Sequence, residues 1–168
     1  MAKKSLEADN KMRSGNLLMT LLKRTPIRTF VIYPLVTLLW EIVLHGRGFT
    51  PNLWFAPLMI LGFLQYRLCG GYRVKHGGGG PGVEKPPDRL VSSGFYAYCR
   101  NPMYLGHIIF LSGLALTLRS WLGMLITIAV AVWFHLRVLS DEKKLLQVLG
   151  RPYAEYLTAV TRWIPGVL

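Results

Sequence analysis

The sequence predicts an all-α, polytopic membrane protein with about four transmembrane helices and further cytosolic helices after the last span. Hydrophobic residues make up 52% of the 168-residue chain, and its mean hydropathy is +0.34. A soluble domain of this size rarely needs so much apolar surface. Several apolar stretches approach the ~20 residues that cross a bilayer. The net charge is nevertheless +12, so basic residues are in excess as well.

Residues 1–26 are polar and basic and lack the pattern of a cleavable signal peptide. Lysines and arginines surround the apolar patch 17–22. This pattern favours a cytosolic arm or a short interfacial helix that lies on anionic lipid. An ordinary tail without structure is the alternative.

The transmembrane spans are predicted from three apolar regions. The first two, 27–44 and 53–68, are separated by a turn-like segment that contains Gly46, Gly48 and Pro51. The third, 103–139, is interrupted only by Arg119 and Ser120. It is too long for one span and therefore predicts a tight helical hairpin. The chain then divides into a basic arm (1–26), a first transmembrane helix pair (27–69), a Gly/Pro-rich cytosolic loop (70–100), and a catalytic hairpin with C-terminal cofactor-binding helices (101–168).

Glycine and proline dominate the predicted loop. Periodicity is lost from Gly70 to Pro87, and the run 77–82 contains five glycines and one proline. Such composition is typical of a linker. The glycines could instead wrap a ligand, but they lack the spacing of a phosphate-binding loop.

Charge placement predicts the orientation of the chain. Of the 20 lysines and arginines, only Arg47 and Arg119 fall in the two proposed outer turns. The positive-inside rule therefore places both termini, and the loop between the helix pairs, in the cytosol. We expect the basic excess to meet membrane lipid and not nucleic acid, and we assign no metal site. Cys69 and Cys99 would lie on the cytosolic side, where thiols stay reduced.

A first group of candidate site residues precedes the third span. Asn101 has the character of an N-cap, and Pro102 suits the first helical position. The helix would then direct free backbone amides and the positive end of its dipole toward the cytosol, which favours an anionic ligand. Arg100 adds a forked, permanently charged donor. The alternative is that Asn101 and Pro102 only begin a helix while Arg100 reaches lipid headgroups.

A second group follows the fourth span. At 100° per residue, Glu142 shares a face with Val138, Leu145 and Leu149. A carboxylate on an apolar face needs a partner. The candidates are Arg100, Arg162, or the amino or hydroxyl groups of a ligand, and a purely structural ion pair is one of the possibilities.

The end of this helix and the beginning of the next are also predicted. Gly150 suits a C-terminal cap, and Pro152 can begin the following helix. In that helix Tyr153 and Tyr156 share a face with Leu157 and Val160. They would either wall an aromatic pocket or lie at the membrane interface.

Together these motifs resemble the integral-membrane methyltransferases typified by isoprenylcysteine carboxyl methyltransferase, with phospholipid N-methyltransferases as relatives. The similar elements are Gly94 and Tyr96, then Arg100, Asn101, Pro102, Tyr104 and Gly106, then Glu142 and Leu145, then Gly150, Tyr153 and Tyr156, and finally Arg162 and Pro165. Two positions depart from the pattern. Asn101 stands where the best-known carboxyl methyltransferases have His, and Asp141 replaces the first Glu of a common Glu pair. Asparagine still donates and accepts hydrogen bonds but does not titrate.

The resemblance implies that S-adenosylmethionine binds where the cytosolic ends of the last two spans meet the C-terminal helices. A lipophilic or lipidated acceptor would reach it from the bilayer, with a prenylcysteine-like carboxylate, a lipid amine or a thiol as the attacking group. Arg100 and Glu142 would position the cofactor, and Arg162 or Tyr104 would orient the acceptor. The implied cofactor-binding residues are Tyr96, Arg100, Asn101, Pro102, Met103, Tyr104, Gly106, Glu142, Tyr153 and Tyr156.

Two other functions compete with this one. A sterol-reductase-like protein would share part of the C-terminal architecture and bind NADPH, although such chains carry many more spans. A non-catalytic membrane scaffold would use its basic rim to bind anionic lipid and Glu142 to form an internal ion pair.

Overall fold

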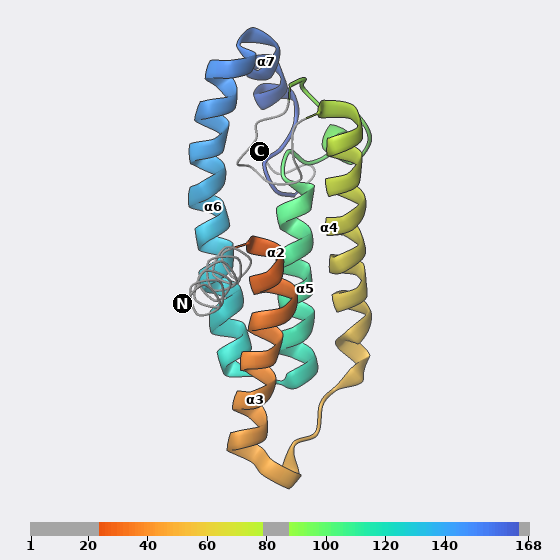
Figure 1. The fold of residues 1–168 in the computed structure, drawn as a ribbon, viewed down its shortest axis with the longest axis vertical. Helices are drawn as coiled ribbons and strands as arrows, with labels where there is room; N and C mark the ends of the chain where they lie inside the picture. Colours follow the sequence, from red (N-terminus) through yellow and green to blue (C-terminus); the bar gives the residue numbers. More distant parts are fainter. Residues whose placement is uncertain (1–23, 79–87, 165–168) are drawn as a thin grey trace, which may run out of the picture.

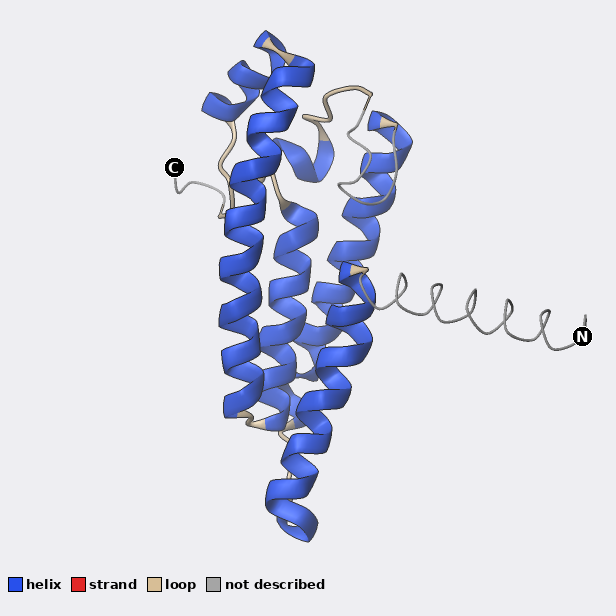
Figure 2. Ribbon diagram, turned by 60° about the vertical axis from the view of Figure 1, so that its left-hand side comes forward, coloured by secondary structure: helices blue, strands red, loops and turns tan. Residues whose placement is uncertain are grey.

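The computed structural model describes residues 24–78 and 88–164. The predicted basic arm lies almost entirely outside these residues. The described part is a bundle of long helices with a smaller helical cap at one end (Figure 1), and it contains no strand (Figure 2). The all-α prediction is therefore confirmed.

The first span is one continuous rod with a change of helical type near its start. It consists of α2 (Thr25–Ile27), the π-helical turn η1 (Arg28–Ile32) and α3 (Tyr33–His45). The amide of Tyr33 bonds to the carbonyl of Arg28, five residues earlier. Pro34 has no N–H to donate, so the wider π turn occurs where the normal hydrogen-bond ladder would be interrupted.

The remaining helices follow the predicted order. They are α4 (Ala56–Gly77), α5 (Pro102–Leu118), α6 (Trp121–Leu149) and α7 (Arg151–Ala159), with short 3-10 turns η2 (Gly46–Gly48), η3 (Leu53–Phe55) and η4 (Gly94–Ala97). In the described residues three helical segments are long and apolar enough to cross a bilayer: Thr25–His45, Leu53–Gly77 and Trp121–Leu149. The fourth, α5, is apolar but has 17 residues.

The structure corrects the start of the Gly/Pro-rich loop. The prediction that the chain leaves the helix at Gly70 is wrong, because α4 continues through Gly70 and Gly71 to Gly77. Cys69 is fully buried in the core, and packing of this kind outweighs the ~1 kcal/mol that each glycine costs in a helix. The helix then ends at Gly78, which has a positive φ of 70°.

Glycines set the distance between α4 and α5, which run side by side in both views (Figures 1 and 2). A Cβ atom on Gly106 would lie 2.8 Å from the carbonyl oxygen of Gly62 and 2.8 Å from the amide nitrogen of Tyr66. A Cβ on Gly113 would lie 2.8 Å from the amide nitrogen of Met59. Small residues thus allow the two backbones to touch, as is common between helices in membranes.

The predicted hairpin between α5 and α6 is confirmed. Arg119 adopts a left-handed conformation (φ 52°) after α5. Ser120 then caps α6, its hydroxyl accepting a 3.0 Å hydrogen bond from the amide of Gly123. The amide of Asn52 bonds to the carbonyl of Thr117 at 2.6 Å. The two predicted outer turns therefore lie together at one end of the bundle.

The first span is displaced along the bundle relative to its neighbours. In both views α2 begins at the level of the middle of α6 and not at the level of its end (Figures 1 and 2). The halves of α4 and α6 that extend beyond α2 carry the helical cap. Below that level, His107 packs among aromatic rings from three other helices, with centroids 4.8 Å from Phe30, 4.6 Å from Tyr66 and 5.4 Å from Phe134.

Candidate active site

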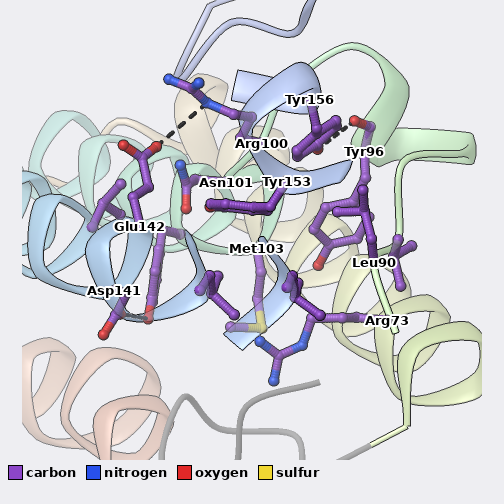
Figure 3. Close-up of a pocket in the computed structure, with 15 residues that line it drawn as sticks. Arg73, Leu90, Tyr96, Arg100, Asn101, Met103, Asp141, Glu142, Tyr153 and Tyr156 are labelled. Atoms are coloured by element: carbon purple, nitrogen blue, oxygen red, sulfur yellow. Dashed lines mark hydrogen bonds and ion pairs between the residues drawn. The ribbon is translucent and has the colours of Figure 1, made fainter. Parts of the chain in front are cut away.

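A pocket lies at the end of the bundle opposite the two joined turns, between α5, α6 and α7 (Figure 3). The residues that line it come from both groups identified in the sequence and from α4. They are Arg73, Leu90, Val91, Tyr96, Arg100, Asn101, Met103, Tyr104, Val138, Asp141, Glu142, Leu145, Leu149, Tyr153 and Tyr156.

The segment that leads into the pocket is shaped by Gly94. This residue has a φ of 60° at the start of η4. A Cβ there would lie 2.8 Å from Cζ of Tyr72, whose hydroxyl is 2.9 Å from the Ser93 hydroxyl. Both the conformation and the close ring therefore call for glycine. The turn delivers Tyr96 to the pocket wall, where its side chain is buried.

The start of α5 is only partly as predicted. Asn101 occupies the N-cap position and Pro102 begins the helix, but the Asn101 side chain caps no amide of α5 in the described structure. Its Nδ2 instead donates to the carbonyl oxygen of Arg162 at 3.2 Å. The expectation of a side-chain cap is therefore wrong. Consequently the amides of Met103 and Tyr104, whose side chains line the pocket, receive no side-chain cap.

Glu142 is held by both of the arginines proposed for it. Its carboxylate is buried, with the residue 8% exposed. Arg162 donates to it from Nε, at 3.2 Å to each oxygen, and from Nη2, at 2.9 Å to Oε2. Arg100 Nε lies 3.3 Å from Oε1, within ion-pair range but without hydrogen-bond geometry. Two cations thus face one carboxylate, which leaves a net positive charge beside the pocket.

The C-terminal segment is fixed over the start of α5 by backbone contacts. The amide of Arg100 donates to the Thr161 carbonyl at 2.9 Å, and the Thr161 hydroxyl donates to the Tyr98 carbonyl at 3.2 Å. Arg100 Nη1 also donates to the carbonyl of Leu157 at 2.6 Å. Residues 157–162 therefore close the site by holding Arg100 in place.

Two tyrosines of the pocket have hydroxyls that are bound to backbone carbonyls. Tyr156 donates to the carbonyl of Tyr96 at 2.6 Å (Figure 3), and Tyr96 donates to the carbonyl of Cys69 at 3.2 Å. Burial raises the pKa of both phenols and raises the pKa of Tyr153 to about 12. All three hydroxyls stay protonated at neutral pH, so none of them acts as a base.

Replacing Tyr156 with Phe tests the contribution of its hydrogen bond to the Tyr96 carbonyl. The Tyr96 carbonyl would lose its short hydrogen bond in a buried place, and we expect a loss of about 1–3 kcal/mol in the free energy of unfolding. Thermal unfolding of the purified protein measures it. Tyr98→Phe is the matched control, since the Tyr98 side chain is 71% exposed. An equal effect of both substitutions would contradict the assignment.

The opposite end of the pocket carries a second polar group. The Tyr104 hydroxyl lies 3.5 Å from Oδ2 of Asp141, and Arg137 Nε lies 3.6 Å from the same oxygen. The Asp141 carboxylate points away from the Glu142 end, on the side where Arg73 also lies (Figure 3). The pocket therefore has two polar ends, with Tyr153, Met103 and aliphatic side chains between them.

Comparison with known proteins agrees with the motifs. A family model described as phospholipid methyltransferase matches residues 82–150. The chain is 32% identical over 78 residues to protein-S-isoprenylcysteine O-methyltransferase of Schizosaccharomyces pombe, a match that covers 45% of this chain and 33% of the relative. It is 32% identical over 87 residues to the Dictyostelium discoideum enzyme of the same name, covering 50% and 36%. It is 36% identical over 81 residues to protein-S-isoprenylcysteine O-methyltransferase B of Arabidopsis thaliana, covering 47% and 41%.

The matched part of the chain is similar to the isoprenylcysteine and phospholipid methyltransferases. The resemblance drawn from the motifs is thereby confirmed. The matches span between a third and two fifths of the length of these relatives. The match to the family model includes both motif groups around the pocket up to residue 150.

Most residues that the methyltransferase motifs predict meet at the pocket. Three of them do not line it. Pro102 faces α4, where its carbonyl accepts from Gln65 Nε2 at 3.0 Å. Gly106 packs against Gly62 and Tyr66. Arg162 reaches the site only through Glu142. The predicted residues that line the pocket are Tyr96, Arg100, Asn101, Met103, Tyr104, Glu142, Tyr153 and Tyr156.

Other lining residues were missed from the sequence. Arg73 lies in a stretch whose composition predicts a loop, so the sequence assigns it to no helical face. In the sequence Asp141 is only a departure from the family pattern, although its position next to Glu142 is a usable signal. Leu90 and Val91 carry no motif and are recognised only in the folded chain.

Proposed function

We propose that this protein is an integral-membrane, S-adenosylmethionine-dependent methyltransferase that acts on a lipophilic acceptor at the cytosolic membrane face. The observation that supports this most is the convergence of both motif groups on one pocket, with Glu142 paired to Arg100 from the first group and Arg162 from the last. The attacking group would be a prenylcysteine-like carboxylate, a lipid amine or a thiol.

The proposed topology has four spans, with α5 as the third and both termini in the cytosol. The turns after α3 and after α5 are joined at one end through Asn52 and Thr117. The opposite end carries the pocket with Arg73 and Arg100. The positive-inside rule assigns the pocket end to the cytosol. Residues 1–26 would form a cytosolic arm on lipid, and residues 101–168 would supply the catalytic hairpin and the cofactor-binding helices.

The donor groups of the pocket suit the parts of S-adenosylmethionine. The uncapped amides of Met103 and Tyr104, together with Arg100, fit the carboxylate of its methionine part. Glu142 fits the amino group or the ribose hydroxyls, because it can accept several hydrogen bonds. The ring of Tyr153 offers a face to adenine. A ligand group would then share Glu142 with the two arginines.

The protein's part in the reaction would be to align the partners and to exclude water. When bound, S-adenosylmethionine supplies an activated methyl group for an in-line displacement. Of the two residues predicted to orient the acceptor, Tyr104 lines the pocket, whereas Arg162 is engaged with Glu142. We therefore favour Tyr104, with Asp141 fixing its hydroxyl. The apolar side chains of Val138 and Leu145 would keep water from the reacting atoms.

One observation favours a scaffold without catalysis as the second candidate. Glu142 already has two cationic partners in the described structure, so its burial is explained without a ligand. This candidate predicts a folded protein that binds no S-adenosylmethionine.

Calorimetric titration of the detergent-purified chain tests the proposal. We expect saturable binding of S-adenosylmethionine and S-adenosylhomocysteine and none of NADPH. Binding would justify a labelled-methyl assay with lipid extracts as acceptors. Binding of NADPH alone would favour a reductase-like protein, and binding of neither by a folded sample would favour the scaffold.

A further inference from the structure

A second cationic site lies outside the methyltransferase pocket, where the first span meets α6. Cζ of Arg28, from η1, lies 5.1 Å from the ring centroid of Trp133 on α6. Cζ of Arg137, one turn further along α6, lies 5.3 Å from the same ring. Two guanidinium groups from different spans thus gather around one indole. The sequence motifs include neither Arg28 nor Trp133, and Arg28 lies outside the family match.

The two arginines are only partly neutralised by the described residues. Nε of Arg28 and Nε of Arg137 are both buried and have no hydrogen-bond partner among the described residues. Asp141 is the nearest carboxylate, but it lies 3.6 Å from Arg137 and is shared with Tyr104. Arg28 forms no ion pair with any described residue. Among the described residues, the site therefore keeps one uncompensated positive charge.

The height of the site in the bundle points to a ligand at the membrane surface. Arg137 lies sixteen residue steps after Trp121, where α6 begins, which corresponds to a rise of about 24 Å. The hydrocarbon core of a bilayer is ~30 Å thick. In the proposed topology α6 begins at the outer face, so Arg137 lies close to the inner edge of the hydrocarbon. Arg28 lies at the same depth because it contacts the same indole ring. Trp side chains are also enriched at this edge. A charge left uncompensated at this depth is costly.

The surroundings of the site are apolar and exposed. Trp133 itself is 37% exposed, and its neighbours Val132 and Leu136 on α6 are 54% and 60% exposed. Val31, three residues after Arg28, is 49% exposed. A ligand that fits both the two guanidinium groups and the apolar surface around them carries an oxyanion on a hydrocarbon chain. Free phosphate would leave the apolar surface uncovered, so the pattern favours a lipid.

We propose that Arg28, Trp133 and Arg137 bind the phosphate of an anionic phospholipid, whose acyl chain lies along α6. A phosphodiester has two free oxygens that accept hydrogen bonds from guanidinium groups, and Arg is well suited to such pairing. The ligand would supply the missing negative charge and accept hydrogen bonds from the two guanidinium groups, whose Nε atoms have no hydrogen-bond partner among the described residues. This site is separate from Glu142 and Arg100, and it does not depend on the methyltransferase activity.

Quenching of tryptophan fluorescence by brominated lipids tests the proposal on the full chain in mixed micelles. We expect brominated phosphatidylglycerol to quench at a several-fold lower lipid fraction than brominated phosphatidylcholine. Because the chain has five tryptophans, Trp133→Phe identifies the relevant signal, and it should abolish the difference between the two lipids. Equal quenching by both lipids in the unsubstituted protein would overturn the proposal.

Substitution of Arg28 distinguishes a built site from diffuse surface charge. Arg28→Gln should weaken the preference for phosphatidylglycerol about fivefold, the usual effect of one basic residue near a membrane surface. Arg24→Gln, at an exposed position four residues earlier, should change it less than twofold. Equal loss in both variants would contradict the proposal. If the Gln variant does not fold, Arg28→Lys replaces it in the experiment. This variant keeps the charge and should retain part of the preference for phosphatidylglycerol.

Competition identifies the source of the oxyanion. Millimolar inorganic phosphate should leave the quenching by brominated phosphatidylglycerol unchanged if the acyl chain contributes to binding. Displacement by phosphate at that concentration would show a simple anion site and would overturn the assignment to a phospholipid.

Discussion

Replacing Glu142 with Gln is expected to lower the affinity for S-adenosylhomocysteine by at least tenfold and to destabilise the unliganded protein. The substitution keeps the size of the side chain but removes the charge that compensates Arg100 and Arg162. A broken buried pair costs roughly 3–5 kcal/mol. Arg162 is one-third exposed, so solvent screens part of this, and we expect about 2 kcal/mol. Calorimetric titration and thermal unfolding measure the two effects.

A matched control and a ligand comparison separate binding from folding in this experiment. Glu155→Gln removes the carboxylate of an exposed pair with Arg151 on α7 and should alter neither quantity noticeably. In the unsubstituted protein, ligand at one hundred times its Kd should add about 2.7 kcal/mol to the free energy of unfolding. The Glu142 variant should gain much less at the same ligand concentration. If both proteins gain equally, Glu142 forms a structural pair and does not contact the cofactor.

Gly62→Ala is expected to lower the melting temperature by many degrees or to prevent folding. A Cβ at this position would overlap the backbone of α5 at Gly106 and Phe110. Because the obstacle is backbone and not a flexible side chain, the helices would have to separate along their length, and ordinary overpacking already costs about 1–3 kcal/mol. Thermal unfolding in detergent measures the loss.

Gly71→Ala is the matched control for Gly62, since it lies on the same helix and no described atom is within 4 Å of its Cβ position. Alanine is a better helix former than glycine by up to ~1 kcal/mol. The control should therefore be neutral or stabilising. Equal losses at both positions would show that α4 tolerates no added side chain for reasons other than contact with α5.

The helices could be predicted from the sequence because membrane spans are determined by local composition. The start and end of the first span, the hairpin at Arg119 and the end of α6 at Gly150 all follow from apolar length and from cap residues. The end of α4 could not be predicted in this way. Gly70 and Gly71 read as a break, and only the burial of Cys69 against neighbouring helices shows why the helix continues.

Most residues of the candidate site could be predicted from the sequence, but the contacts between them could not. The apolar face of α6 showed that Glu142 needs a partner, and the sequence offered Arg100 and Arg162 without deciding between them. The structure uses both, because residues 157–162 fold back over the start of α5. The same return contact takes the Asn101 amide away from its expected capping role. Long-range contacts of this kind leave no periodic signal in the sequence.

The return of residues 157–162 onto the start of α5 also affects how the protein is made. In the proposed topology the hairpin can insert into the bilayer as soon as α5 and α6 have been synthesised, but Arg100 gains its backbone partners Leu157 and Thr161 only later. Until that stretch has left the ribosome, the Glu142 carboxylate also lacks its partner Arg162. Membrane insertion would thus precede completion of the site, and a nascent chain stalled before Leu157 would be inserted but unable to hold a ligand.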